Sequence, residues 1–184
     1  MKKTTLILAS IISLISTTLL AEEIPASVLK MAPTFMSFGS NAALVAAVNK
    51  QNTENLSLDE IKSRDQKWQA TPGVDAFMTS LLENSGAKAL FEIEKSKPYF
   101  VELFLMDNKG ANVSMTNKTG DYWQGDEAKW KKSFNNGAGA LHVGKVKFDE
   151  SAQAYLVQVS VPVKDADKVV GALTIGINLD ELGE

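Results

Sequence analysis

The spacing of apolar residues changes once along the chain, near Tyr99, and this change limits the folds that the sequence can adopt. Before that point apolar residues recur every three or four positions, which is the period of an α-helix. Beyond it, branched and aromatic residues form short runs that predict five strands, at residues 99–106, 111–115, 140–148, 154–163 and 169–178. The connections at 107–110, 149–151 and 165–167 carry turn-forming residues. The pattern therefore predicts an α+β domain with helices packed on a five-stranded antiparallel sheet.

The first predicted helix has a narrow apolar seam whose members are spaced alternately four and three residues apart: Ile24, Val28, Met31, Phe35, Phe38, Ala42 and Val45. Pro33 and Gly39 interrupt this long N-terminal helix, so we expect either a kink or a regular part that begins near Pro33. Two uses of the seam stay open. It packs on the domain's own sheet, or it joins two chains as a homodimer through the N-terminal helix.

Two shorter helices are predicted before the strands. Ser57 stands three residues before Glu60, which is the spacing of a capping box, and the helix that it starts runs toward Trp68. Thr71 followed by Pro72 predicts the start of the next helix, and Gly86 predicts its end or a break in it.

Residues 1–21 have the order of a secretory signal peptide: Lys2 and Lys3, an uncharged run, and then Ala21. Serines and threonines interrupt the run, which is shorter than the roughly 20 apolar residues that span a bilayer. Cleavage after Ala21 is therefore favoured over an uncleaved inner-membrane anchor, and we expect a periplasmic or secreted protein. We divide the chain into a signal peptide, residues 1–21, and one domain, residues 22–184, with a helical part at 22–97 and a sheet part at 98–184.

Composition narrows the classes of partner and cofactor. The chain has 19 Lys and Arg residues and 22 Asp and Glu residues, so removal of Lys2 and Lys3 leaves 17 against 22, a net charge of −5. The basic residues are scattered, which makes nucleic acid an unexpected partner. The chain has no Cys and therefore no disulfide and no lipid on a Cys side chain.

Residues for the common catalytic and metal chemistries are scarce. His142 is the single His and no Cys is present, which excludes Cys–His catalysis and a multi-His metal site. The residues around His142 do not resemble a nucleophile elbow. Asp121, Asp126 and Glu127 lack the spacing of a calcium-binding loop, so we interpret them as solvated charge. We expect no enzyme, no metal and no cofactor.

Three large aromatic residues, Tyr122, Trp123 and Trp130, fall in a segment that is otherwise predicted as a loop and one helical turn. A solvated loop has no use for so much apolar area. These side chains either close the open face of the sheet as a lid or line a cavity, and the two interpretations are compatible.

Four stretches in order, residues 100–110, 121–127, 158–163 and 170–177, give the chain a family resemblance. Their succession resembles the Cache (PDC, PAS-like) extracytoplasmic sensor domains, over nearly all of residues 22–184. The resemblance implies a PAS-like sheet and a small-molecule ligand, an amino acid, amine or short carboxylate, on one sheet face beneath residues 116–136.

The same resemblance implies pocket roles for the aromatic side chains of Tyr122, Trp123 and Trp130, and for polar groups on the strands that follow. Those polar groups belong to His142, Tyr155 and Asp149. Arg64 is the only Arg and lies in the helical part, so the Arg that receives a ligand carboxylate in many relatives is not evident.

The chain stops soon after the last predicted strand, whereas relatives of this kind continue into an output module. We therefore expect a stand-alone periplasmic sensor that passes its ligand state to a partner, such as a membrane sensor or a transporter. The alternative is a ligand-free dimerisation or docking module on the same scaffold. A filled sheet face with no cavity would favour that alternative.

Overall fold

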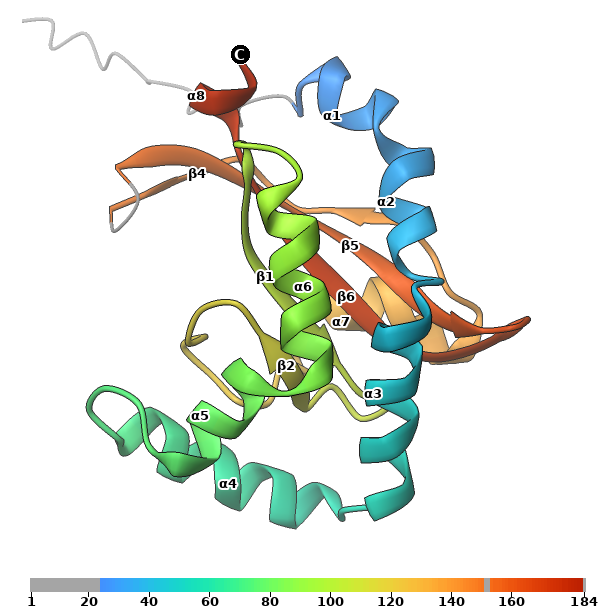
Figure 1. The fold of residues 1–184 in the computed structure, drawn as a ribbon, viewed down its shortest axis with the longest axis vertical. Coiled ribbons are helices and arrows are strands. Elements are labelled where there is room, and N and C mark those ends of the chain that lie inside the picture. The colour runs from blue at the N-terminus through green and yellow to red at the C-terminus, as the bar shows by residue number, and fades with distance from the viewer. Residues whose placement is uncertain (1–23, 151–152, 184) are drawn as a thin grey trace, which may run out of the picture.

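An antiparallel sheet lies at the centre of the computed structural model, which describes residues 24–150 and 153–183 (Figure 1). The predicted signal peptide, residues 1–21, and its cleavage lie outside these described residues. The strands are β1 (Phe100–Met106), β2 (Asn112–Met115), β3 (His142–Val143), β4 (Lys147–Asp149), β5 (Ala154–Asp165) and β6 (Lys168–Asn178). Their order is β2-β1-β6-β5-β3, and β4 also pairs with β5. The predicted α+β class with an antiparallel sheet is confirmed.

The predicted third strand, residues 140–148, is divided into β3 and β4, which gives the described sheet six strands instead of five. Val143 pairs with Val159 and Lys147 pairs with Leu156, so four steps along one strand face three steps along the other. One extra residue on the edge strand interrupts the ladder as a β-bulge does. The Gly144 amide still donates to the Gln158 carbonyl oxygen at 2.8 Å before the chain leaves the ladder.

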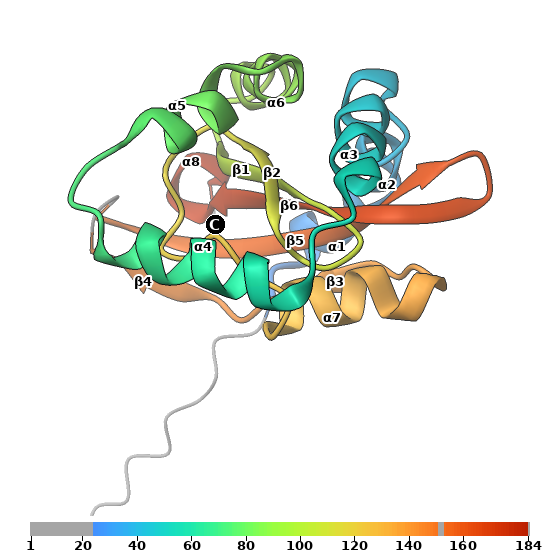
Figure 2. The same ribbon diagram turned by 90° about the horizontal axis from the view of Figure 1, so that it is seen from below.

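Helices cover one face of the sheet along most of its length, and fewer helices lie against the other face (Figure 2). The described helices are α1 (Ala26–Lys30), α2 (Ala32–Phe38), α3 (Ala42–Glu54), α4 (Leu58–Ala70), α5 (Ala76–Glu83), α6 (Ser85–Lys95), α7 (Ala128–Phe134) and α8 (Leu179–Leu182), with a 3-10 turn at Asn135–Gly137. Helices α2, α3 and α6 form the first layer, and α7 lies on the opposite face. Within residues 24–150 and 153–183, no helix has the length and apolar character needed to cross a membrane.

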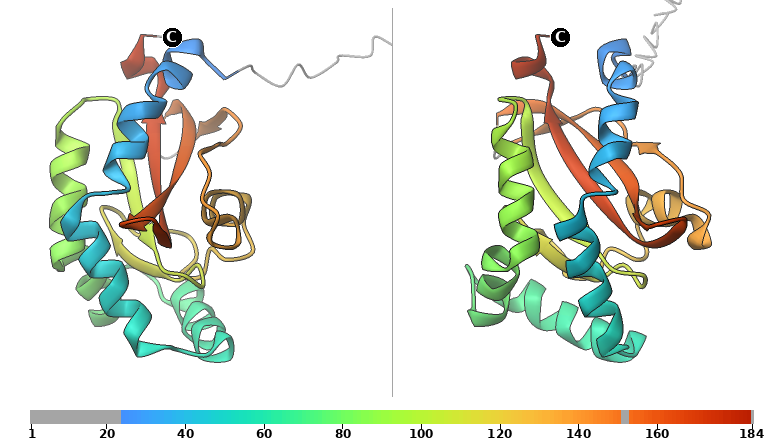
Figure 3. Two further views of the ribbon diagram at one scale, coloured as in Figure 1. Left: turned by 90° about the vertical axis from the view of Figure 1, so that its right-hand side faces the viewer. Right: turned by 45° about the vertical axis from the view of Figure 1, so that its right-hand side comes forward.

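The predicted long N-terminal helix is interrupted near Pro33 and at Gly39, as expected, and consists of three helices that turn along the sheet (Figure 3). The breaks fall at Met31 and at residues 39–41. A Cβ atom on Gly39 would lie 2.1 Å from the Pro162 carbonyl oxygen, so the chain passes too close to β5 for any larger residue. Asn41 then begins α3, since its side chain accepts hydrogen bonds from the amides of residues 43 and 44.

The break changes which side chains of the N-terminal helices face the sheet. Val28 and Phe35 are buried as the seam predicts, but beyond Gly39 the buried residues are Leu44 and Val48, while Ala42 is exposed. All four buried side chains pack against the sheet in one hydrophobic cluster. The interpretation that the seam packs on the domain's own sheet is confirmed, and the two-chain contact stays a prediction.

The capping box at Ser57 and Glu60 is confirmed, with both of its reciprocal hydrogen bonds present. The helix start predicted at Thr71–Pro72 is wrong, because α4 runs to Ala70 and the Asp75 side chain caps α5 by accepting from the Met78 amide at 2.8 Å. Helix α6 was not predicted at all. Asn84 caps α6, and Gly86 lies inside its first turn against Ser114, so Gly86 serves close packing and not helix termination.

Candidate functional site

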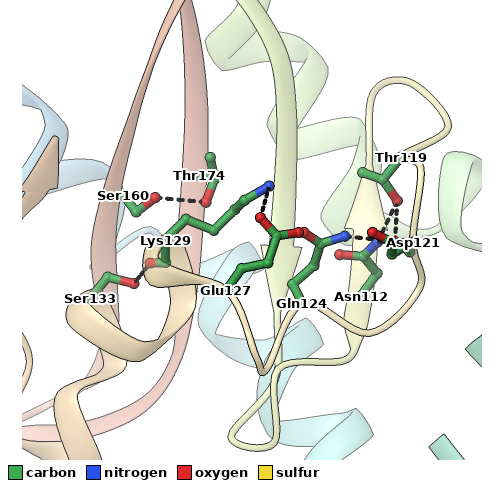
Figure 4. Close-up of polar contacts among 9 residues, drawn as sticks. All are labelled: Asn112, Thr119, Asp121, Gln124, Glu127, Lys129, Ser133, Ser160 and Thr174. Carbon is green, nitrogen blue, oxygen red and sulfur yellow. Dashed lines mark hydrogen bonds and ion pairs between the residues drawn. The ribbon is translucent and has the colours of Figure 1, made fainter. Parts of the chain in front are cut away.

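Alternation along β1 separates a helix-covered face of the sheet from a second face. Leu103 and Leu105 belong to the cluster under the helices, whereas Phe104 and Met106 belong to a different cluster on the opposite side. That second cluster contains Trp68 of α4 and fills only one end of the face. The remainder of the second face lies beneath α7 and carries the polar pair Ser160 and Thr174, both fully buried and hydrogen-bonded at 2.8 Å (Figure 4).

The segment between β2 and α7 is fixed to the sheet by backbone pairing. The Asn112 amide donates to the Tyr122 carbonyl oxygen at 2.9 Å, and the Gln124 amide donates to the Gly110 carbonyl oxygen at 2.7 Å. From the other side, one carboxylate oxygen of Asp65 accepts from the amides of Tyr122 and Trp123 at 2.8 and 3.0 Å. These bonds hold residues 121–127 over the second face, where their side chains border open space.

Two cavities lie on this face, and both are bordered by the same four side chains, Glu102, Glu127, Lys129 and Gln158. The loop-side cavity, about 170 Å³, also has Asp121 and Gln124 in its wall. The strand-side cavity is about 880 Å³ and is also lined by Lys132, His142, Lys145, Phe148, Asp149 and Leu156. Together they have the size at which proteins bind small molecules.

Lys129 of α7 lies at the boundary between the two cavities. Its Nζ atom lies 3.1 Å from a carboxylate oxygen of Glu127 and 5.2 Å from the centre of the Phe104 ring. The side chain is only 17% exposed, so this ammonium is largely removed from water. A shielded ammonium is stabilised by the carboxylate and by the negative face of the ring.

Glu102 reaches the boundary from an irregular part of β1. Its φ of 53° lies in the left-handed region, and the pairing of β1 with β6 shifts register between Val101 and Phe104 at the same place. Burial raises the pKa of the Glu102 carboxyl, the negative charges of Asp149 and Glu94 raise it further, and the positive charge of Lys129 lowers it. A non-glycine residue in this conformation is unfavourable, and such strain gathers at functional sites.

Gln124 brings an unused acceptor to the loop-side cavity. It is 2% exposed, and its Nε2 atom donates to the Asp121 carbonyl oxygen at 2.7 Å. Its Oε1 atom has no hydrogen-bond partner in the described structure. Figure 4 shows the tips of Gln124, Glu127 and Lys129 turned toward the same region. Burial is the main cause that raises the pKa of the neighbouring Asp121 carboxyl, and nearby carboxylates add to it.

The three aromatic residues predicted for the pocket are fixed within the protein, one by ring packing and two by hydrogen bonds to backbone carbonyl groups. Tyr122 is 1% exposed and packs between Trp68 and Phe77 in the second cluster, where burial raises its pKa to about 12. The indole nitrogen of Trp123 donates to the Lys109 carbonyl oxygen, and that of Trp130 donates to the Asp107 carbonyl oxygen. None of the three lines either of the two cavities. Their packing fits the lid interpretation, and their contact with a ligand stays a prediction.

The strand residues predicted for the pocket are divided between the cavity and the surface. His142 and Asp149 both line the strand-side cavity, and burial followed by the charge of Lys132 lowers the pKa of the His142 imidazole. Tyr155 is 44% exposed, stacks edge-on against Phe148, and lies outside the lining of both cavities. Their binding roles also stay predictions.

The residues at the boundary were missed from the sequence, although two of them left a signal. Glu102 is the one charged residue in the run 100–106, and Gln158 interrupts the apolar run 154–159. An isolated polar residue inside a buried strand indicates a site. Asp121 and Glu127, interpreted as solvated charge, line the loop-side cavity instead. Among residues 24–150 and 153–183, no group of three His, Asp or Glu side chains could hold a metal ion.

Solved structures with a similar arrangement are sensor domains of low sequence identity. They include the sensor domain of the Vibrio cholerae histidine kinase DctB, with 11% identity, a TM-score of 0.47, and coverage of 85% of this chain and 51% of that one. The ligand-binding domain of the Pseudomonas aeruginosa amino acid chemoreceptor PctC, in complex with GABA, has 14% identity, a TM-score of 0.43, and coverage of 84% and 62%. That of the Campylobacter jejuni chemoreceptor Tlp3, in complex with 4-methylisoleucine, has 12% identity, a TM-score of 0.42, and coverage of 86% and 62%.

The chain thus spans less than two thirds of the length of these solved chains. No curated protein matches its sequence. A family model does match, over residues 74–184, and it describes the first PDC sensor domain of methyl-accepting chemotaxis protein-like sequences. This match includes every strand, α7 and the whole boundary between the two cavities. The chain therefore belongs to the methyl-accepting chemotaxis protein-like PDC sensor domain family, as its resemblance to Cache domains predicted.

Proposed function

We propose that this protein is a periplasmic small-molecule sensor that binds its ligand in the joined cavities on the second face of the sheet. The observation that supports this most is the shared boundary of Glu102, Glu127, Lys129 and Gln158, where charged and polar groups surround open space. Charged side chains are buried at a cost unless they serve a partner, which makes this boundary the natural place for a polar ligand.

The expected ligand is an amino acid, an amine or a short carboxylate. The walls carry charges of both signs, with Asp121, Glu127 and Lys129 around the loop-side cavity and Lys132 and Lys145 around the strand-side cavity. Phe148 and Leu156 add apolar surface for a short carbon chain. The protein is proposed to bind this ligand without converting it and to pass the bound state to a membrane sensor or a transporter.

The signal would leave through the sheet. Residues of β1 and β5 alternate between the cavity face and the helix face, so Phe104 and Gln158 have Leu103, Leu105, Val157 and Val159 as their neighbours on the other side. A ligand that shifts the cavity face therefore also biases the packing of α2, α3 and α6. Partner binding would then depend on the surface of that helical layer.

A thermal-shift screen of the purified chain against amino acids, amines, short carboxylates and purines tests the proposal. A ligand that binds only the folded state at about 100 times its Kd stabilises it by about 2.7 kcal/mol. In a protein of this size that corresponds to a rise in Tm of roughly 5–10 °C. Gln158→Phe, which fills the boundary, should abolish the rise, and Gln153→Phe, on an exposed residue outside both cavities, should not.

A ligand-free docking module is the second candidate, because the inward packing of Tyr122 and the ion pair of Lys129 occupy part of this face. In that case no compound in the screen would change the Tm of the wild-type chain. The Gln158→Phe variant would then raise the Tm by filling empty space, and the purified chain would form a dimer or bind a partner without a small molecule.

A further inference from the structure

Three carboxyl groups gather at the loop-side cavity around one lysine that points into the site. Glu102, Asp121 and Glu127 all line this cavity, and burial raises the pKa of the first two. The positive charge of Lys129 opposes the rise in both pKa values, and Lys129 forms an ion pair with Glu127. The ammonium of Lys118 also reaches the wall, but it donates to the carbonyl oxygens of Thr71 and Gly73 at 2.8 Å each.

The cavity therefore has more negative than positive charge, and it contains acceptors that no donor uses. In the part of the chain that the structure describes, the Glu102 carboxylate has no hydrogen bond or ion pair, and Gln124 Oε1 is buried without a partner. A buried acceptor without a donor, such as Gln124 Oε1, is destabilising, and a donor on a ligand would remove that cost. An ammonium group supplies three donors and a positive charge, and therefore satisfies both deficits.

The position of Lys129 gives the same answer independently. Its own ammonium lies at 5.2 Å from the centre of the Phe104 ring and at 3.1 Å from Glu127, in a place where a small cation would make identical contacts. A carboxylate ligand would have to enter beside three carboxyl groups, which like-charge repulsion disfavours. The strand-side cavity, with Lys132, Lys145 and His142, provides room for the remainder of the ligand.

We infer that the loop-side cavity is a subsite for a primary ammonium group, formed by Glu102, Asp121, Glu127 and the Gln124 side-chain oxygen, and that Lys129 competes with the ligand for it. The ligand is an aliphatic amine or an amino-carboxylate that enters with its ammonium end first. When it binds, Lys129 yields its contact with Glu127 or shares it. This inference rests on the proposed ligand-binding function and assigns its chemistry.

Three probes, each with a four-carbon chain, test which charge the site recognises. They are butylamine, 4-aminobutanoate and butanoate. Titration calorimetry with the full-length chain should detect butylamine and 4-aminobutanoate, and no binding of butanoate. Glu102→Gln should weaken the two ammonium probes about tenfold or more, since a hydrogen bond to a charged group contributes about 1.5–3 kcal/mol and 1.4 kcal/mol is tenfold. The matched control is Glu92→Gln, on the exposed side of α6.

Lys129→Met is the most decisive variant. Removal of Lys129 strengthens ligand binding if Lys129 competes with the ligand and weakens it if Lys129 contacts the ligand favourably. If Lys129 competes, its removal strengthens the binding of butylamine several-fold, and the exposed neighbour Lys131→Met changes nothing. Lys129→Gln, which keeps a polar helix-forming side chain, should act in the same direction and covers the case in which the Met variant does not fold. Weaker binding of butylamine by the folded Lys129 variants would overturn the inference.

The two proposals fail in distinguishable ways. Binding of butanoate in preference to butylamine, or of another compound class in the wider screen, would leave a ligand-binding sensor and overturn the ammonium subsite. Absence of any bound compound, both in the wild-type chain and in Lys129→Met, would overturn the sensor proposal together with the subsite.

Discussion

Glu102 has an unfavourable backbone conformation, and its negative charge lies in an unfavourable environment. Its φ of 53° is one that non-glycine residues adopt rarely, and its half-buried carboxyl faces Asp149 from β4 and Glu94 from α6, with Lys129 from α7 as the opposing charge. The Glu102 amide is held by the Glu94 side-chain oxygen at 3.1 Å, and that same oxygen accepts from the Thr116 hydroxyl at 2.9 Å. The surrounding bonds thus keep a residue that stability alone would not select.

Glu102→Gln should stabilise the ligand-free protein at neutral pH. Because the folded-state pKa of Glu102 lies above its unfolded value, the folded protein loses stability as the pH rises through the interval between the two. The Gln variant does not undergo this loss. Its gain in unfolding free energy should be less than about 1 kcal/mol, because solvent screens a half-exposed carboxylate. Urea unfolding as a function of pH measures it. A gain that persisted at pH 3, where the wild-type carboxyl is protonated, would contradict this cause.

Protonation of Glu102 should weaken ligand binding, although the same protonation stabilises the ligand-free protein. A protonated Glu102 cannot attract an ammonium, so butylamine binding should weaken as the pH falls through the raised pKa of Glu102, before ordinary carboxyl groups titrate. Calorimetry from pH 7.5 downward should show that the wild-type chain loses affinity at a higher pH than the ordinary range of a glutamate carboxyl. Glu102→Gln should reduce this dependence, and Asp121, whose pKa burial also raises, should account for the remainder. An unchanged slope would assign it to a group other than Glu102.

At the scale of elements, the segment over the cavities depends on one side chain from α4. Asp65→Ala removes the acceptor for the amides of Tyr122 and Trp123, which lie in a partly buried place, and should cost about 1–3 kcal/mol of unfolding free energy. Hydrogen exchange should accelerate at these two amides. The exposed Gln66→Ala on the same helix is the control, and equal exchange in both variants would show that the segment is held elsewhere.

The corner between α2 and α3 depends on the absence of a side chain. Gly39→Ala places a Cβ atom 2.1 Å from the Pro162 carbonyl oxygen, and overpacking of this kind costs about 1–3 kcal/mol. The corner's hydrogen bond from the Lys164 amide to the Gly39 carbonyl oxygen, at 2.9 Å, should weaken as well. Thermal unfolding measures the loss. Gly120→Ala is the matched control, since its Cβ would meet no atom within 4 Å.

These elements also mark what sequence patterns could and could not predict. The hairpin of β1 and β2 and the pairing of β5 with β6 were predictable, because strand periodicity and turn residues are local signals. The corner at Gly39 was not, because its cause is a close approach to Pro162 far along the chain. The boundary of Glu102, Lys129 and Gln158 was missed for the same reason, since β1, α7 and β5 bring these residues together only in the folded chain.

At the scale of the whole molecule, two hydrophobic clusters share one sheet. The first contains Leu90 and lies under α3 and α6, and the second contains Met78 and all three tryptophans on its inside or border. Neighbouring residues of β1 contribute to both clusters, so neither can be lost while the sheet remains intact. We expect the described domain to unfold as one cooperative unit.

Leu90→Ala tests this unity, because it alters a cluster that contains no tryptophan. A buried Leu→Ala change costs about 2–5 kcal/mol, and the lower Tm should be the same by tryptophan fluorescence, which reports the second cluster, and by far-UV circular dichroism. Met78→Ala provides the reciprocal change. Two separate transitions in either variant would mean that the clusters unfold independently.

The two faces of the sheet have different roles, and this affects how the ligand specificity of such a domain can change during evolution. Burial under α3 and α6 supplies much of the hydrophobic core, while the boundary side chains of the other face contribute little to it. Substitutions at Glu102, Lys129 or Gln158 can therefore alter what is recognised while the folding core is conserved. Related chains that descend from one ancestor could in this way come to bind different ligands, and every sequence along the path would still fold.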